Sequence, residues 1–149
     1  MPDDLKNLPQ FDKSKFNTVP YIKKIDKPWG YELHWAPGGM AYMGKVLHID
    51  AGKRLSLQVH DEKQETYWLV NGECDLIIEN SQGEMETIKM QKGYGYTTFV
   101  GQRHRHHAVT DCDVVEASTA EAGTTWRLED DYERPNETPE QRKIERNEV

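Results

Sequence analysis

The sequence predicts an all-β protein with a single domain, built as a sandwich or barrel of short strands. Runs rich in β-branched and aromatic residues recur at intervals of about 8–12 residues, separated by turn residues such as Asn71-Gly72. The length of 149 residues suits one core of ordinary size. We expect strands over residues 43–50, 54–60, 65–70, 74–79, 84–90, 95–99, 104–109 and 114–118.

Two polar segments flank the predicted strands. Residues 1–22 contain three prolines and no helical or strand periodicity, so we expect an extended arm there. Residues 135–149 carry few apolar side chains and cannot bury enough surface to order themselves strongly. We therefore divide the chain into an N-terminal arm at 1–22, one domain at 23–134, and a polar tail or short surface helix at 135–149.

Charge and composition exclude several classes of protein. With a net charge of -7, the chain is repelled by phosphate backbones and anionic lipids, so we expect no nucleic-acid partner and no membrane partner. No apolar run approaches the roughly 20 residues that span a bilayer, and the first six residues lack the layout of a signal peptide. We expect a cytoplasmic protein whose two cysteines, Cys74 and Cys112, are reduced packing residues.

Polar side chains with metal-binding chemistry occupy the predicted strand at residues 54–60. The two-residue period of a strand places Gln58 and His60 on one face. A four-residue turn follows, so an antiparallel hairpin would bring Glu65 back beside His60. The pattern therefore predicts that an amide, an imidazole and a carboxylate are neighbours.

A second group of such side chains lies on the predicted strand at residues 104–109. Alternation separates His104 and His106 from Arg105 and His107, so at most two of the three histidines point inward together. This strand would add one or two imidazoles to the polar group on the earlier strand.

The pattern alone leaves two interpretations open. One carboxylate, two imidazoles and an amide oxygen suit a borderline divalent ion such as Zn²⁺, Fe²⁺, Mn²⁺, Ni²⁺ or Co²⁺. In the alternative interpretation, His60 and Glu65 form a surface ion pair and the Arg/His run is a solvated loop.

Glycines and metal-type side chains follow a fixed spacing in two segments. From Gly52 to Gly72, the order Gln58-Val59-His60 and then Glu65 resembles the first motif of the cupin superfamily, with Gln in place of its first His. The segment from Gly93 to His104 resembles the second cupin motif. Phe99 stands where that motif usually has Pro, and Ala108 stands where it usually has Asn. The resemblance implies a double-stranded β-helix, which is a jelly-roll barrel.

Three segments narrow the resemblance further. Residues 27–32 (KPWGYE), 54–60 (RLSLQVH) and 127–132 (RLEDDY) are similar to small single-domain cupins related to type II phosphomannose isomerases, over most of the chain. By this resemblance, a divalent ion, Zn²⁺ before the others, is held by Gln58, His60, Glu65 and His104. The chain departs from that pattern at Glu133, where Gly is common, and at His106 and His107.

The activity that this resemblance implies is mannose 6-phosphate isomerisation, a metal-dependent conversion between an aldose and a ketose. Such a reaction moves a proton between C1 and C2, so it needs a metal ion to polarise oxygens and a base to carry the proton. We predict Glu116 or His106 as the base and Arg54 as the contact to the phosphate. Other basic candidates for that contact are Arg103, Arg105 and Lys27.

Two other functions remain open at this point. Two histidines and a carboxylate also suit a non-haem Fe(II) dioxygenase. The chain is alternatively a non-catalytic module that binds a metal and a sugar, because a fold does not determine an activity. In each case we expect the partner to be a small sugar or sugar phosphate.

The same strand predicts the assembly. If Gln58 and His60 point inward, alternation sends Leu55, Leu57 and Val59 outward, where they form an apolar stripe. The N-terminal arm or a second subunit has to cover such a stripe. We therefore expect a homodimer, with the arm exchanged or packed between subunits.

Overall fold

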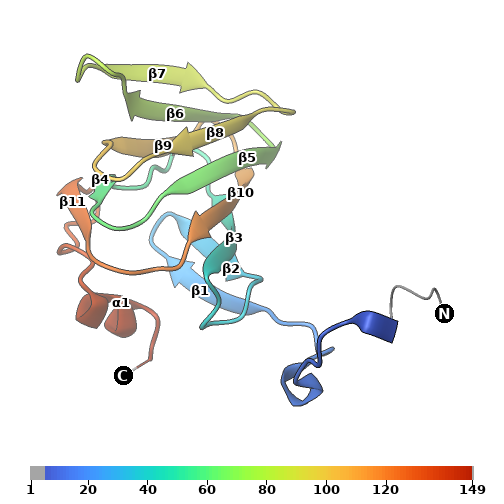
Figure 1. Cartoon of the computed structure of the whole chain (residues 1–149). Coiled ribbons are helices and arrows are strands. Elements are labelled where there is room, and N and C mark those ends of the chain that lie inside the picture. The colour runs from blue at the N-terminus through green and yellow to red at the C-terminus, as the bar shows by residue number, and fades with distance from the viewer. Residues whose placement is uncertain (1–5, 149) are drawn as a thin grey trace.

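Two antiparallel β-sheets face one another in the computed structural model, which describes residues 6–148 (Figure 1). Within this range, the first sheet has six strands, in the order β1 (Lys23–Lys27), β2 (Gly30–His34), β3 (Tyr42–Ile49), β10 (Cys112–Thr119), β5 (Glu65–Asn71) and β8 (Gly95–Thr98). The second sheet, over the same residues, has five, in the order β11 (Thr125–Glu129), β4 (Leu57–His60), β9 (His104–Ala108), β6 (Cys74–Glu79) and β7 (Met85–Lys89). The all-β architecture that the sequence predicts is confirmed.

All the predicted strands are present, as β3 to β10, and no end differs by more than three residues. The sequence does not predict β1, β2 or β11. These strands place Lys27, Glu32 and Arg127 toward the interior, where they line a cavity. The apolar alternation that marks a half-buried strand is therefore missing from them.

The interior between the sheets changes character along the strands. Both sheets contribute to an apolar core at one end, which includes Cys74 and Cys112 as buried free thiols, as expected. Strand β5 follows the change, because its inward residues run from Leu69 through Tyr67 to Glu65. One end of the barrel therefore holds the core, and the other end holds buried polar groups.

The chain crosses from one sheet to the other at the turn after His60. Strand β4 pairs with β11 and β9 in the second sheet, whereas β5 pairs with β10 and β8 in the first. The predicted hairpin between β4 and β5 is therefore wrong. Glu65 nevertheless contacts His60, because the crossing turn brings the start of β5 against the end of β4.

Leu55 is buried in the core and only 8% exposed, so its predicted place in an outward apolar stripe is wrong. Strand β4 begins only at Leu57, and Arg54 forms an isolated bridge with His107. Strand alternation consequently does not extend back to Leu55. Leu57 and Val59 lie within the strand and are half-buried.

The two flanking segments differ from one another. Residues 1–5 of the arm, on which the expected lack of a signal peptide also rests, lie outside the described residues. Residues 6–22 are exposed throughout, with a 3₁₀ turn at Lys13–Lys15, and extend away from the barrel (Figure 1). The C-terminal segment contains helix α1 (Pro139–Glu145), which begins after the capping residue Thr138. Within residues 6–148, no helix combines the length and the apolar character needed to cross a membrane.

We expect a second copy of the chain to cover the arm. Phe11, Phe16 and Ile22 are 63%, 67% and 63% exposed, and a cluster of large exposed apolar side chains commonly marks an interaction surface. Light scattering at micromolar concentration should report twice the chain mass of 17.3 kDa. Deletion of residues 1–20 should weaken this dimer because it removes most of that surface. A monomer that is indifferent to the deletion would contradict this expectation.

Candidate metal centre

Three side chains converge at the polar end of the barrel interior. His60 ends β4, Glu65 begins β5 and His104 begins β9, and one ligand-type atom from each lies within 4.8 Å of the others. We call these three residues the triad. Nε2 of His60 contacts Oε1 of Glu65, and Nε2 of His104 lies 3.8 Å from the same oxygen. The structure thus brings together three of the four predicted ligands.

The triad fits a metal ion because its converging atoms are buried and lack regular hydrogen bonds. Nε2 of His60, Nε2 of His104 and Oε1 of Glu65 are buried and make no regular hydrogen bond within residues 6–148. Buried polar atoms in folded proteins are almost always hydrogen-bonded, so a convergent set of such atoms is suited to a cation. Two imidazoles and one carboxylate are ligands that Zn²⁺, Fe²⁺ and Mn²⁺ accept.

A neighbouring group orients each side chain of the triad. Nδ1 of His104 donates a hydrogen bond of 2.8 Å to the carbonyl oxygen of Gln102, which leaves the lone pair on Nε2. Nδ1 of His60 is hydrogen-bonded to Oγ1 of Thr125 at 2.9 Å. The hydroxyl of Tyr67 donates to Oε2 of the triad glutamate at 2.8 Å. Such outer contacts are typical of metal ligands, whose ring orientation they fix.

Gln58, the fourth predicted ligand, pairs with His104 across β4 and β9 and lines the same cavity as His60. Its Oε1 accepts a hydrogen bond of 2.9 Å from Oγ of Ser56. A carbonyl oxygen has two lone pairs, so one remains for a metal ion. Gln58 therefore stays a predicted ligand beside the triad.

The two predicted bases are buried close to the triad. The ring of His106 packs edge-on against Tyr67, with 4.4 Å between centroids. Burial, helped by His104, lowers the pKa of His106 to about 3, so this imidazole is neutral near neutral pH. Oε2 of Glu116 is buried without a hydrogen bond from the described chain. Burial and the nearby carboxylate of Glu65 raise the pKa of Glu116 well above its ordinary value.

The structure does not bring Arg54 to the site. Its guanidinium forms a two-pronged ion pair with Asp131 at 2.6 and 2.8 Å, and both side chains are 39% exposed. Arg54 precedes β4, where strand alternation does not apply, and it does not line the cavity beside the triad, so the structure does not support its predicted contact with a phosphate there. Arg103 likewise pairs with Glu79 at 3.0 Å. Of the predicted basic candidates, Lys27 lines the cavity beside the triad, and the other basic groups in that lining come from positions outside the predicted set.

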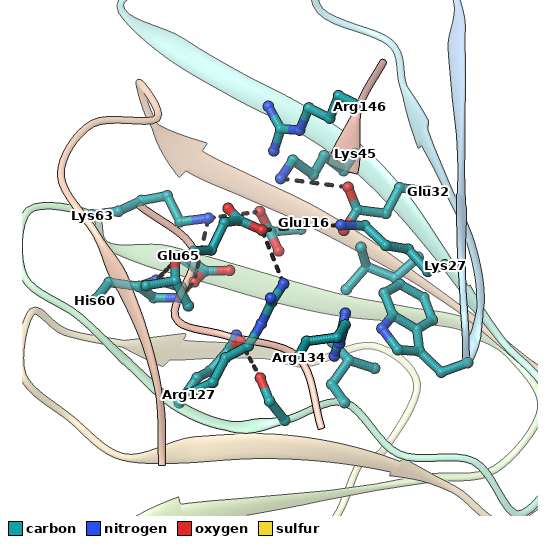
Figure 2. A pocket seen from close by; sticks show the side chains of 17 residues that line it. Lys27, Glu32, Lys45, His60, Lys63, Glu65, Glu116, Arg127, Arg134 and Arg146 are labelled. Atoms are coloured by element: carbon teal, nitrogen blue, oxygen red, sulfur yellow. Dashed lines mark hydrogen bonds and ion pairs between the residues drawn. The ribbon is translucent and has the colours of Figure 1, made fainter. Parts of the chain in front are cut away.

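A cavity of about 50 Å³ adjoins the triad and is lined mainly by charged side chains (Figure 2). In Figure 2, His60 and Glu65 lie at one side of it and Lys45 and Arg146 at the other. Among the described residues, basic side chains outnumber acidic ones in this lining, with Lys27, Lys45, Lys63, Arg127, Arg134 and Arg146 against Glu32, Glu65, Glu116 and Glu137. Basic side chains that face a closed space can hold an anionic ligand.

Sequence reasoning missed most of this lining. The sequence could have indicated that Lys45 is an interior residue, because strand alternation puts it on the same face of β3 as Leu47 and Ile49. A lysine on the buried face of a strand indicates a paired interior charge. Arg146 had no such signal, because it follows α1 in the segment that we expected to be a polar tail.

The buried charges hold one another ionised. Nζ of Lys45 contacts Glu121 and lies 3.8 Å from Glu32, and Nζ of Lys63 lies 3.7 Å from Glu65. Burial opposes the charged form of both lysines, but the neighbouring carboxylates outweigh it and raise their pKa values. Burial likewise opposes ionisation of Glu65, yet Lys63 and the triad histidines lower its pKa well below the ordinary value. The triad carboxylate is therefore negative, as a cation site requires.

No family model and no curated protein sequence matches the chain. Solved structures do match it. KdgF from Halomonas sp. superposes with a TM-score of 0.56 at 17% identity, over 67% of this chain and 89% of that chain. Oxalate decarboxylase of Bacillus subtilis gives a TM-score of 0.61 at 13% identity, over 78% and 35%. CapF of Staphylococcus aureus, a capsular polysaccharide assembling protein, gives 0.55 at 14% identity, over 85% and 34%.

The likeness to these structures concerns the fold. The chain spans most of the length of KdgF and about a third of the other two proteins. Identities of this size carry no activity from one protein to another. The shared feature is the arrangement of two antiparallel sheets, and the oxalate decarboxylase of Bacillus subtilis has Mn(II) centres. The chain therefore has the cupin fold, an all-β jelly-roll barrel.

Proposed function

We propose that the chain is a metal-dependent enzyme that interconverts the aldose and ketose forms of a sugar phosphate such as mannose 6-phosphate. The observation that carries this proposal is the convergence of the unbonded triad atoms beside the buried carboxyl of Glu116. The triad and Gln58 would hold a divalent ion, with Zn²⁺ expected first. When bound, the ion supplies polarisation of the carbonyl and hydroxyl oxygens of the sugar.

Proton transfer is assigned to Glu116 in preference to His106. Glu116 lines the cavity, whereas His106 is not among its described lining residues. The raised pKa of Glu116 makes its carboxylate a stronger base than an ordinary one, which suits proton exchange with a carbon. Nζ of Lys63 lies 3.9 Å from Oε2 of Glu116 and would stabilise the ionised form. Glu116 would thus carry the proton between C1 and C2.

Three further observations support a sugar phosphate as the substrate. The cavity lining includes basic side chains, which can hold an anion. The sequence resembles that of type II phosphomannose isomerases at residues 27–32 and 127–132, and both segments contribute side chains to the cavity lining. The fold is also that of CapF, whose description is a capsular polysaccharide assembling protein.

The composition of the triad favours a second candidate function. Two histidines and one carboxylate are the ligand set of non-haem Fe(II) oxygenases. Oxygen consumption by the Fe(II)-loaded protein would support a dioxygenase over the isomerase. Tight sugar binding without turnover would support a non-catalytic binding module.

Replacement of a triad histidine should remove most of the metal. We expect His60→Ala and His104→Ala each to weaken metal affinity at least about tenfold while the fold survives, because the apolar pattern sets the strand register. Elemental analysis after dialysis, with circular dichroism on the same samples, measures both effects. His107→Ala, on the same strand as His104 but outside the triad, is the matched control. If both triad variants retained full metal, the ligand assignment would be wrong.

The charge of Glu65 can be tested without a change of shape. Glu65→Gln keeps the size of the side chain and removes the negative charge that offsets the cation. We expect weaker metal binding with an unchanged circular dichroism spectrum. An unchanged metal affinity would show that Glu65 does not face the ion.

Glu116→Gln should separate proton transfer from metal binding. We expect kcat to fall by roughly 10²–10⁴-fold with metal content retained, because the amide cannot accept the proton. A coupled assay with mannose 6-phosphate measures this, and Glu86→Gln, an exposed change on β7, is the control. Absence of turnover by the unchanged protein with every divalent ion would refute the isomerase.

A further inference from the structure

A carboxylate from the C-terminal helix occupies a ready-made anion site. Both oxygens of Glu145 accept hydrogen bonds from Arg127, at 2.9 Å from Nη2 and 3.0 Å from Nη1. Nζ of Lys27 lies 3.8 Å and Nη1 of Arg134 lies 3.9 Å from Oε1 of the same carboxylate. Three cationic side chains thus surround the carboxylate of Glu145. We call Lys27, Arg127 and Arg134 the cradle.

The cradle is more deeply buried than ordinary surface charges. The side chains of Lys27, Arg127 and Arg134 are 5%, 3% and 14% exposed. Nε of Arg127 is buried without a hydrogen-bond partner in the described chain, so the cradle has one N–H group available to a ligand. Glu137 also approaches it, at 3.2 Å from Nη2 of Arg127 and 4.0 Å from Nζ of Lys27. Buried cations of this kind are costly to keep and are frequently part of a functional site.

The cradle belongs to the cavity of the metal centre. Lys27, Arg127 and Arg134 line the same cavity as His60 and Glu65, and Figure 2 shows their side chains directed toward it. They come from β1, from β11 and from the segment that follows β11. A ligand in the cavity can therefore reach the triad with one end and the cradle with the other.

Helix α1 is held by ionic contacts and not by apolar packing. None of its residues is buried, and Ile144, its apolar residue, is 57% exposed. Arg142 pairs with Glu137 at 2.9 Å, and Arg146, just after the helix, pairs with Glu121 at 2.5 Å. Within the described part of the chain, the apolar core contains no residue of α1. Glu145 can consequently leave the cradle without breaking the core.

The cavity has little free space while Glu145 is in place. Its volume is about 50 Å³, enough for a few water molecules, whereas pockets for small molecules commonly measure roughly 300–1,000 Å³. A sugar phosphate therefore needs the surrounding side chains to move before it can enter. An incoming anion that displaces Glu145 from the cradle would enlarge the cavity as it binds.

Resting on the proposed function, we infer that the cradle is the binding site for the phosphate group of the substrate, and that Glu145 is a built-in competitor for it. A phosphate monoester carries close to two negative charges and three terminal oxygens at neutral pH. It can satisfy Arg127 with two oxygens and Lys27 and Arg134 with the remaining one, which one carboxylate cannot do. The ligand class is a phosphomonoester.

Removal of the competing charge should strengthen phosphate binding. In calorimetric titrations of the metal-loaded full chain with inorganic phosphate, Glu145→Gln should bind at least about fivefold more tightly than the unchanged protein, because more of the cradle is free. Glu140→Gln removes the same charge from an exposed position on the same helix and should leave the affinity unchanged. Equal affinity of the Glu145→Gln variant and the unchanged protein would overturn the inference.

Two more variants separate competition from a simple loosening of the helix. Arg142→Gln weakens the attachment of α1 without freeing the cradle, so it should raise phosphate affinity less than Glu145→Gln does. Lys27→Met should weaken phosphate binding at least about fivefold, with metal content and circular dichroism unchanged. Equal tightening by Arg142→Gln, or full affinity in Lys27→Met, would contradict the inference.

The test is independent of turnover. If phosphate binds as described but mannose 6-phosphate is not isomerised, the cradle stands and the isomerase reaction fails. If phosphate binds only to the metal, the cradle variants will have no effect while His104→Ala will abolish binding, and the inference fails. Mannose 6-phosphate should bind more tightly than mannose in the unchanged protein, and equal affinities would also count against the cradle.

Discussion

Charge buried at one end of a β-barrel is the constraint on which the rest of this structure depends. The inward positions of the strands at that end carry glutamates, lysines and arginines that water hardly reaches. An unpaired buried charge is strongly destabilising, so each must face an opposite charge or a bound ion. The strands and the helix that supply these counter-charges, β1, β2, β11 and α1, are accordingly the parts of the chain that close the site.

The apolar end of the barrel makes this polar end possible. A core shared by both sheets stabilises the strands, so side chains at the other end need not contribute hydrophobic burial. The triad lies at strand ends and not on free loops, and contacts from Thr125, Gln102 and Tyr67 orient it. Ligands held in this way keep their geometry before an ion arrives.

The sequence was informative wherever alternation separates apolar from polar side chains. It predicts β3 to β10. The ligand set of His60, Glu65 and His104 came from the resemblance to cupins, since the hairpin expected to join His60 to Glu65 is wrong and β4 and β5 lie in different sheets. The sequence does not predict β1, β2 or β11, since their buried faces carry charge. Arg54 and Leu55 were misplaced for a related reason, because they precede β4 and lie outside the regular strand. The position of α1 could not be predicted, because several of its ion pairs are with residues distant in the sequence and no local pattern indicates such pairs.

The central claim is that the triad binds a divalent ion inside this barrel, since the fold by itself does not determine an activity. A crystal structure of the metal-loaded full chain, with data collected at the absorption edge of the ion, tests it most directly. We predict an anomalous peak about 2.0–2.2 Å from Nε2 of His60, Nε2 of His104 and Oε1 of Glu65. A loaded protein with its peak elsewhere and none at the triad would contradict the account.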